Sequence, residues 1–147
     1  MSLPTSGFTA AELIALLRAA RAELDAFAAC LPQQAWLGPR APVLNPPRWE
    51  YGHIVWFQER WCLRQQTDGT VAPSRVAHAD ALYDSSQGAH DTRWDLPLLH
   101  REALDAYGTG VFEDVADKLH AALPGAPVFY FAELALYHER MHLEAWW

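Results

Sequence analysis

The chain has 147 residues, a length suited to one domain built around a single hydrophobic core. Its formal net charge of -7, with no run of basic residues, argues against nucleic-acid binding, because phosphate contacts require a basic face. No apolar stretch approaches the roughly 18 residues that a membrane span needs, and no secretion signal is visible, so we expect a cytoplasmic protein.

Two helices are predicted in the first half of the chain. The first begins at Thr9, which has a capping-box spacing to Glu12 and is followed by apolar residues at helical spacing. Several prolines then interrupt regular structure, and a second helix is predicted from about Pro47 to Gln66. Its aromatic face carries Trp49, His53, Trp56, Phe57 and Trp61. His53 is therefore expected to point inward.

A polar segment from Thr67 to Asp95 is longer than most connections in a compact domain, and such loops are usually functional or disordered. It contains Leu82, Tyr83, Arg93 and Trp94. We therefore expect an ordered loop that covers a site. Arg93 is expected to face this site and to bind a carboxylate or other anionic group of a substrate, because its guanidinium is a planar, permanently charged fork.

Two more helices are predicted in the second half of the chain. One runs from near Pro97 to the Pro124-Gly125 pair, and the other begins after Pro127. The last helix is still in pattern at Trp146 and Trp147, which suggests either an expression boundary or an uncovered surface that normally meets another domain. No segment alternates at period two for long enough to predict a strand. The predicted fold class is all-α, a four-helix bundle.

Three histidines are candidate metal ligands. His138 and His142 are four residues apart, so both rings project from one face of the last helix, on its predicted buried stripe. His53, on another helix, can close a tripod that leaves coordination positions open for chemistry. The alternative is a hydrogen-bonded pair of core histidines. We expect the other four histidines to be solvated.

The segment His138-Glu139-Arg140-Met141-His142 also spells the zincin motif H-E-x-x-H. We discount that function, because no third ligand follows and no sheet is predicted that could hold a peptide. Glu139 is then a solvent-facing residue or a support for a ligand. The two cysteines, Cys30 and Cys62, are isolated and are expected to be small buried hydrophobes, although Cys62 is a weak alternative ligand.

Two segments of the chain resemble signatures of the DinB-like domain in ergothioneine-type sulfoxide synthases. These are residues 46–60, which include His53, and residues 138–144, which include His138 and His142. Residues 81–86 and 90–97 are more similar to the selenoneine synthase branch. At Arg140, Met141 and Leu143 the chain departs from the glutamines of the ergothioneine branch.

This resemblance implies a DinB/YfiT-like four-helix bundle in which His53, His138 and His142 bind non-haem Fe(II). In the family, iron and O₂ join a thiol or selenium donor to hercynine, the trimethylated histidine betaine. Family members continue into a C-terminal domain that supplies a catalytic tyrosine and much of the hercynine pocket. The resemblance thus implies the N-terminal metal-binding domain of a longer two-domain enzyme, inactive in isolation.

Two other functions remain open at this stage. The first is a stand-alone DinB-like thiol transferase that uses a different divalent ion, since three imidazoles also suit zinc or nickel. The second is a non-enzymatic helical module whose terminal aromatic residues bind a partner. Iron content and a requirement for O₂ would separate the oxygen-dependent enzyme from the transferase.

Overall fold

The computed structural model describes residues 3–146, and the elements of regular structure named in this range are all helices. The α-helices are α1 (Ala10–Cys30), α2 (Pro47–Cys62), α3 (Ala79–Tyr83), α4 (Arg101–Ala121) and α5 (Pro127–Glu144). Two short 3₁₀ helices are η1 (Gln33–Trp36) and η2 (His90–Trp94). A single isolated antiparallel bridge joins Gln65 and Val71 after α2, and no strand occurs among these residues.

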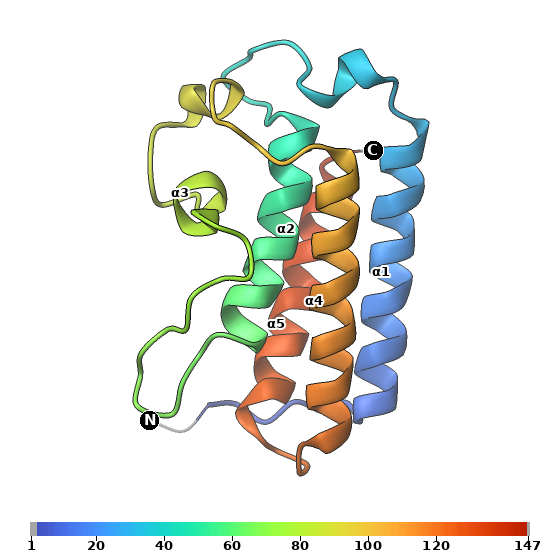
Figure 1. The fold of residues 1–147 in the computed structure, drawn as a ribbon. Coiled ribbons are helices and arrows are strands. Elements are labelled where there is room, and N and C mark those ends of the chain that lie inside the picture. The colour runs from blue at the N-terminus through green and yellow to red at the C-terminus, as the bar shows by residue number, and fades with distance from the viewer. Residues whose placement is uncertain (1–2, 147) are drawn as a thin grey trace.

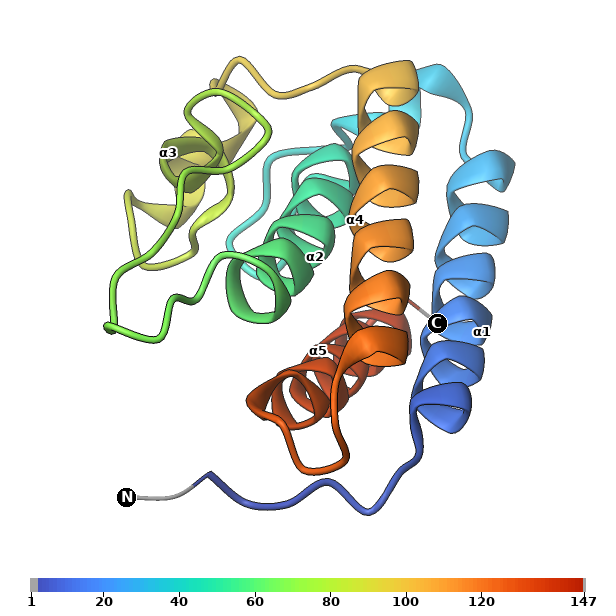
Figure 2. The same ribbon diagram turned by 60° about the horizontal axis from the view of Figure 1, so that its bottom comes forward.

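The four long helices form a bundle. Helices α1 and α5 run in one direction and α2 and α4 in the other (Figure 1). Helices α2 and α1 each pack against both α4 and α5, so the order around the bundle is α1, α5, α2, α4. The short α3 lies outside the bundle and beside α2 (Figures 1 and 2). The prediction of an all-α four-helix bundle is confirmed.

The helix starts follow the local sequence. The side chain of Thr9 accepts a hydrogen bond from the backbone N–H of Glu12, and Glu12 accepts one from the backbone N–H of Thr9 in return. This is the predicted capping box. Helices α2 and α5 each begin with a proline, at Pro47 and Pro127, where the missing N–H costs no hydrogen bond.

Two predicted boundaries were wrong by about a turn. Helix α2 ends at Cys62 instead of Gln66, because the chain reverses there and Arg64 turns to bind Asp80 and the carbonyl of Ala72. Helix α4 begins at Arg101 instead of Pro97. The carbonyls of the two residues before His100 accept hydrogen bonds from Arg48, and these bonds hold that stretch outside the helix.

The long segment between α2 and α4 is ordered and packs on α2 through α3. Its Tyr83 is fully buried, and the phenolic oxygen accepts a hydrogen bond from the backbone N–H of Leu99 at 3.0 Å. The Tyr83 ring lies directly against the backbone of Gly52 in α2, where a Cβ atom would overlap it. Gly52 therefore permits the close approach of α3 to α2.

The predicted stripe on α5 needs a correction. The fully buried side of α5 carries Ala132, Ala135, Leu136, Glu139 and Leu143. His138 and His142 are half-buried at the edge of this side, where α5 faces α2. The helical period predicts one inward face, but three neighbouring helices surround α5, so residues on different faces are covered to different extents.

Three further expectations are tested by burial. Trp146 is half-buried and packs against Phe27, with ring centroids 4.5 Å apart and the planes tilted by 32°, so the prediction of an uncovered Trp146 was wrong. Trp147 lies outside the described residues. Cys62 is buried as predicted, and burial raises the pKa of its thiol to about 12. Cys30 is exposed, contrary to prediction, because it ends α1.

None of the described helices combines the length and apolarity needed to cross a bilayer.

Candidate metal centre

The rings of His53, His138 and His142 converge between α2 and α5. One ligand atom from each ring lies within 4.8 Å of those of the other two. The Nε2 atom of His138 is 3.1 Å from Nε2 of His53 and 3.2 Å from Nε2 of His142. The structure therefore brings together the three histidines that the sequence singled out.

Two of the rings are oriented by hydrogen bonds at their outer nitrogens. The Nδ1–H group of His53 donates to the backbone carbonyl of Tyr83 at 2.7 Å. The Nδ1–H group of His142 donates to the carboxylate of Glu50 at 2.5 Å. A carbonyl or an ionised carboxylate can only accept, so Nδ1 carries a proton in both rings, and in the neutral form of each ring Nε2 presents a lone pair.

Aromatic side chains stack on the rings of His138 and His53. His138 stacks on Phe57, with ring centroids 3.8 Å apart and planes 10° from parallel. His53 stacks on Trp49 at 4.7 Å and 10°. The Nδ1 atom of His138 is buried and has no hydrogen-bond partner among the described residues. The orientation of His138 therefore depends on stacking with Phe57.

The Nε2 atoms form a donor set that fits a cation. The lone pairs of His53 and His142 both face Nε2 of His138, which can donate at most one proton to one of them. At least one lone pair would then lack a proton donor in this set. A shared metal ion would accept all three nitrogens, and imidazole suits zinc, iron, copper and nickel alike. This donor set does not by itself select one of them.

Burial keeps two of these rings, His53 and His138, neutral. Burial lowers the pKa of His53 to about 4, with His142 and Arg93 adding to the decrease and the Tyr83 carbonyl opposing it. Burial lowers the pKa of His138 to about 3, and the two neighbouring rings lower it further. Neutral imidazole is the form that binds metals, so both rings are ready to coordinate near neutral pH.

Glu139 does not belong to the histidine cluster. Its side chain is buried, and its carboxylate accepts hydrogen bonds from Arg21 on α1 at 2.9 and 3.3 Å. The two histidines of the H-E-x-x-H segment face α2, whereas the glutamate between them pairs with α1. The carboxylate is thus engaged elsewhere, and the expectation of a solvent-facing Glu139 was wrong.

Arg93 lies close to the cluster. Its guanidinium carbon is 3.8 Å from the centre of the Trp49 ring that also stacks on His53. One guanidinium nitrogen donates to the side-chain oxygen of Asn45 at 2.5 Å. Burial lowers the pKa of Arg93, while the nearby charge of Glu50 opposes the shift. No salt bridge from Arg93 to a carboxylate is formed among the described residues.

The remaining candidates lie apart from the cluster. Within the described residues, the group of side chains that could hold a metal contains the three histidines and not Cys62. His78, His100 and His120 are exposed, and His90 is half-buried with its ring edge against Trp94.

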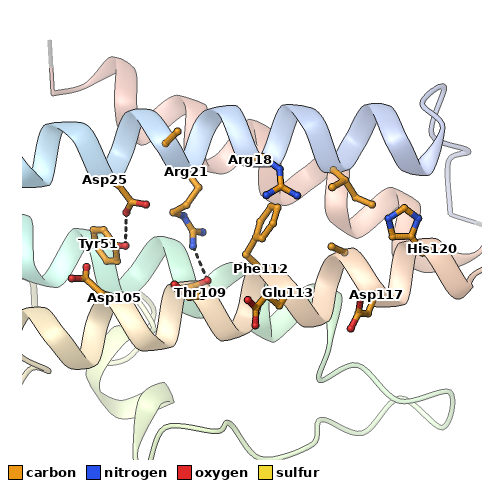
Figure 3. Close-up of a pocket in the computed structure, with 14 residues that line it drawn as sticks. Arg18, Arg21, Asp25, Tyr51, Asp105, Thr109, Phe112, Glu113, Asp117 and His120 are labelled. Carbon is orange, nitrogen blue, oxygen red and sulfur yellow. Dashed lines mark hydrogen bonds between the residues drawn. The ribbon is translucent and has the colours of Figure 1, made fainter.

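Two of the grooves on the described part of the chain differ in their position relative to the histidines. One, of about 700 Å³, lies between α1 and α4, across the bundle from the α2–α5 seam (Figure 3). Inside it Tyr51 donates a hydrogen bond to Asp25 at 2.7 Å. The other, of about 490 Å³, is lined by Asn45, Glu50 and Trp146 among others. Of these two grooves, the second is lined by residues that contact Arg93 or the histidine cluster, namely Asn45 and Glu50.

Some residues of this site were missed by sequence reasoning. Glu50 could have been found, because it precedes His53 by three residues and so lies near it on the same side of α2. The backbone carbonyl of Tyr83 carries no signal in the sequence. The contact of Trp146 with Glu50, in which the indole N–H donates at 2.7 Å, depends on how α5 docks against α2.

The helical fold and the three converging imidazoles place this chain among helical-bundle proteins with a candidate metal site. The sequence profile of the DinB superfamily matches residues 16–145, and the chain belongs to this superfamily.

Two similar proteins are hercynine oxygenases. The protein from Mycolicibacterium smegmatis is 33% identical over 106 residues, which cover 70% of this chain and 24% of the relative. The protein from Mycobacterium tuberculosis is 30% identical over 105 residues, with the same coverages of 70% and 24%. The chain thus spans about a quarter of the length of these relatives. They support the ergothioneine-related resemblance, while the selenoneine branch stays a prediction.

Proposed function

We propose that this chain is the metal-binding domain of a non-haem iron, O₂-dependent enzyme that forms a C–S or C–Se bond on hercynine. The observation that carries the proposal is the convergence of the three Nε2 atoms, two of them in rings whose outer nitrogens are already hydrogen-bonded. The similarity to two hercynine oxygenases supports hercynine as the substrate.

The proposed cofactor is Fe(II), with zinc and nickel as alternatives, held by His53, His138 and His142. When bound, the iron would supply sites for O₂ and for a soft sulfur or selenium donor, and would relay electrons from the substrates, which are oxidised, to O₂, which is reduced. The protein's part is to keep the His53 and His138 rings neutral and to orient the three rings. The aromatic rings of Trp49 and Phe57 would limit the access of water to His53 and His138.

Arg93 is the proposed substrate-binding residue. Its closeness to Trp49 and its lack of a carboxylate partner among the described residues support a role in binding an anionic group of the donor substrate. Charge-assisted, two-pronged hydrogen bonding would orient a carboxylate beside the histidines. The groove at Asn45 and Glu50 offers a route to this position.

The proposed domain organisation places residues 1–147 in the N-terminal part of a longer two-domain enzyme. The relatives, about four times as long as the matched segment, support this organisation. Residues beyond this domain would then position hercynine, and positioning contributes a large part of enzymatic rates. The isolated chain is expected to bind metal without sustained turnover of hercynine. The assay is mass spectrometry of the product in which the thiol or selenium donor is joined to hercynine. Multiple turnover by the 147-residue chain would contradict this organisation.

Replacing a ligand tests the metal centre. The wild-type protein, purified anaerobically with Fe(II), is expected to hold one iron per chain, and His138→Ala is expected to lose it, because two imidazoles bind far more weakly than three. Metal content is measured by emission spectroscopy. His100→Ala, at an exposed position before α4, is the matched control and should keep the iron. Equal iron content in wild type and His138→Ala would contradict the proposed site.

Replacing Arg93 tests substrate binding. The iron-loaded wild type is expected to bind cysteine more tightly than cysteinamide, because only cysteine has a carboxylate. Arg93→Gln should abolish this preference, a loss of about 10- to 100-fold in affinity for cysteine. Arg40→Gln, at an exposed arginine paired with Asp95, is the control and should retain the preference. An unchanged preference in Arg93→Gln would show that Arg93 does not recognise the carboxylate.

A further inference from the structure

Glu50 is a buried carboxylate with an unusual set of partners. It lies in the first turn of α2 and is 5% exposed. Burying a carboxylate is costly unless it is paired or hydrogen-bonded. Among the described residues Glu50 forms no salt bridge with a lysine or arginine, and the nitrogen closest to its Oε1 atom is Nδ1 of His142. Its burial therefore depends on the groups that donate hydrogen bonds to it.

Both carboxylate oxygens of Glu50 accept hydrogen bonds from the end of α5. One oxygen accepts from Nδ1 of His142 at 2.5 Å, and the other from the indole N–H of Trp146 at 2.7 Å. His142 lies in the last turn of α5, and Trp146 follows the end of that helix at Glu144. The Trp146 ring is held in turn by Phe27 of α1. The carboxylate is thus fixed from two sides and presents one oxygen to the His142 ring.

The three histidines differ in what supports them. His142 has a carboxylate at its outer nitrogen, His53 has a backbone carbonyl, and the outer nitrogen of His138 has no partner among the described residues. A carboxylate at this position fixes the tautomer and the ring plane, and it makes the imidazole a stronger donor to a metal. Of the three histidines, His142 is therefore the one whose tautomer and ring plane are fixed by the strongest hydrogen-bond acceptor.

We propose that Glu50 is a positioning residue that holds His142 in the Nδ1–H tautomer, with Nε2 aimed at the other two rings, and that Trp146 holds Glu50 in place. The role in metal binding rests on the proposed function of the site. Control of the tautomer and ring plane does not, because the hydrogen bonds exist without a ligand.

The test combines two measurements on Glu50→Gln, Glu50→Ala and Trp146→Phe. Long-range ¹H–¹⁵N NMR of the metal-free protein reports the tautomer of His142, and competition with a chelator for Zn(II) reports affinity. Glu59→Gln is the matched control, because Glu59 is also a buried carboxylate of α2 but binds Ser74, Arg75 and Tyr107. It should leave both readouts unchanged.

Each variant has its own expected result. Glu50→Ala should lose the Nδ1–H tautomer of His142 and bind Zn(II) about 10- to 100-fold more weakly. Glu50→Gln should keep the tautomer, since an amide oxygen still accepts, but should bind Zn(II) more weakly because the charge is gone. Trp146→Phe should keep the tautomer and show a smaller loss of affinity. If Glu50→Ala does not fold, the Zn(II) affinity of Glu50→Gln is compared with that of Glu59→Gln, and a lower affinity in Glu50→Gln alone supports the role of Glu50.

The outcomes separate this inference from the proposed function. An unchanged tautomer in folded Glu50→Ala would overturn the inference, as would equal Zn(II) affinity in Glu50→Gln and wild type. If wild type binds no Zn(II) or Fe(II) while Glu50→Ala changes the tautomer, the proposed metal function fails and control of the ring by Glu50 stands.

Discussion

Replacing Arg21 with methionine is expected to lower the free energy of unfolding by about 3–5 kcal/mol, the usual effect of leaving one charge of a buried pair alone. Arg21 on α1 is 7% exposed and binds Glu139 of α5 through two nitrogens. It also donates to Gln58 of α2 at 3.0 Å and to the carbonyl of Gly108 in α4 at 3.2 Å. One side chain thus connects all four long helices.

The charge of Arg21 is maintained in this setting. Burial is the largest single effect and lowers the pKa of Arg21, but Glu139, with smaller contributions from Tyr51 and Asp25, raises the pKa above its usual value. Arg21→Met therefore removes the cation and leaves the carboxylate of Glu139 without its ionic partner. The cost is that of an uncompensated charge, which exceeds the net value of the pair.

Two controls sharpen the Arg21 experiment, which is measured by denaturant unfolding. Arg21→Met combined with Glu139→Leu should recover most of the lost stability, because no unpaired charge remains. Arg140→Ala breaks an exposed pair with Glu23 and should cost at most about 1 kcal/mol. A loss in Arg21→Met as small as that in Arg140→Ala would show that the four-helix connection is not important for stability.

Gly52→Ala is expected to lower the free energy of unfolding by about 1–3 kcal/mol and also to weaken metal binding. A Cβ atom at position 52 would overlap the Tyr83 ring, coming within 2.5 Å of its Cζ and 2.7 Å of its Cδ1. The ring has no room to retreat, because it is fully buried and its hydroxyl is bonded to Leu99. The backbone of α3 must move instead.

Movement of α3 reaches the histidine cluster directly. The Tyr83 carbonyl accepts the hydrogen bond from Nδ1 of His53, so a shift of Tyr83 loosens the orientation of that ring. Thermal unfolding and chelator competition for Zn(II) measure the two effects. Gly7→Ala is the control, since a Cβ there meets nothing within 4 Å. If Gly52→Ala unfolds at the same temperature as the wild type and binds Zn(II) with the same affinity, the close contact between α3 and α2 is contradicted.

The class of fold and the identity of the histidines could be predicted from local patterns. The capping box of Thr9 and Glu12 and the proline starts of α2 and α5 act within a few residues, so they are visible in the sequence. The spacing of His138 and His142 is likewise a property of a single helix. Such features depend on the helical period and do not require knowledge of the neighbours.

The partners of each side chain were decided by the tertiary structure. The period of a helix tells which residues share a face, but not which neighbouring helix covers that face or in what register. The sequence therefore could not show that Glu139 pairs with Arg21, that Glu50 supports His142, or that α5 buries a face other than its histidines. The Tyr83 carbonyl bound by His53 is a backbone group, identical at every position until the chain folds.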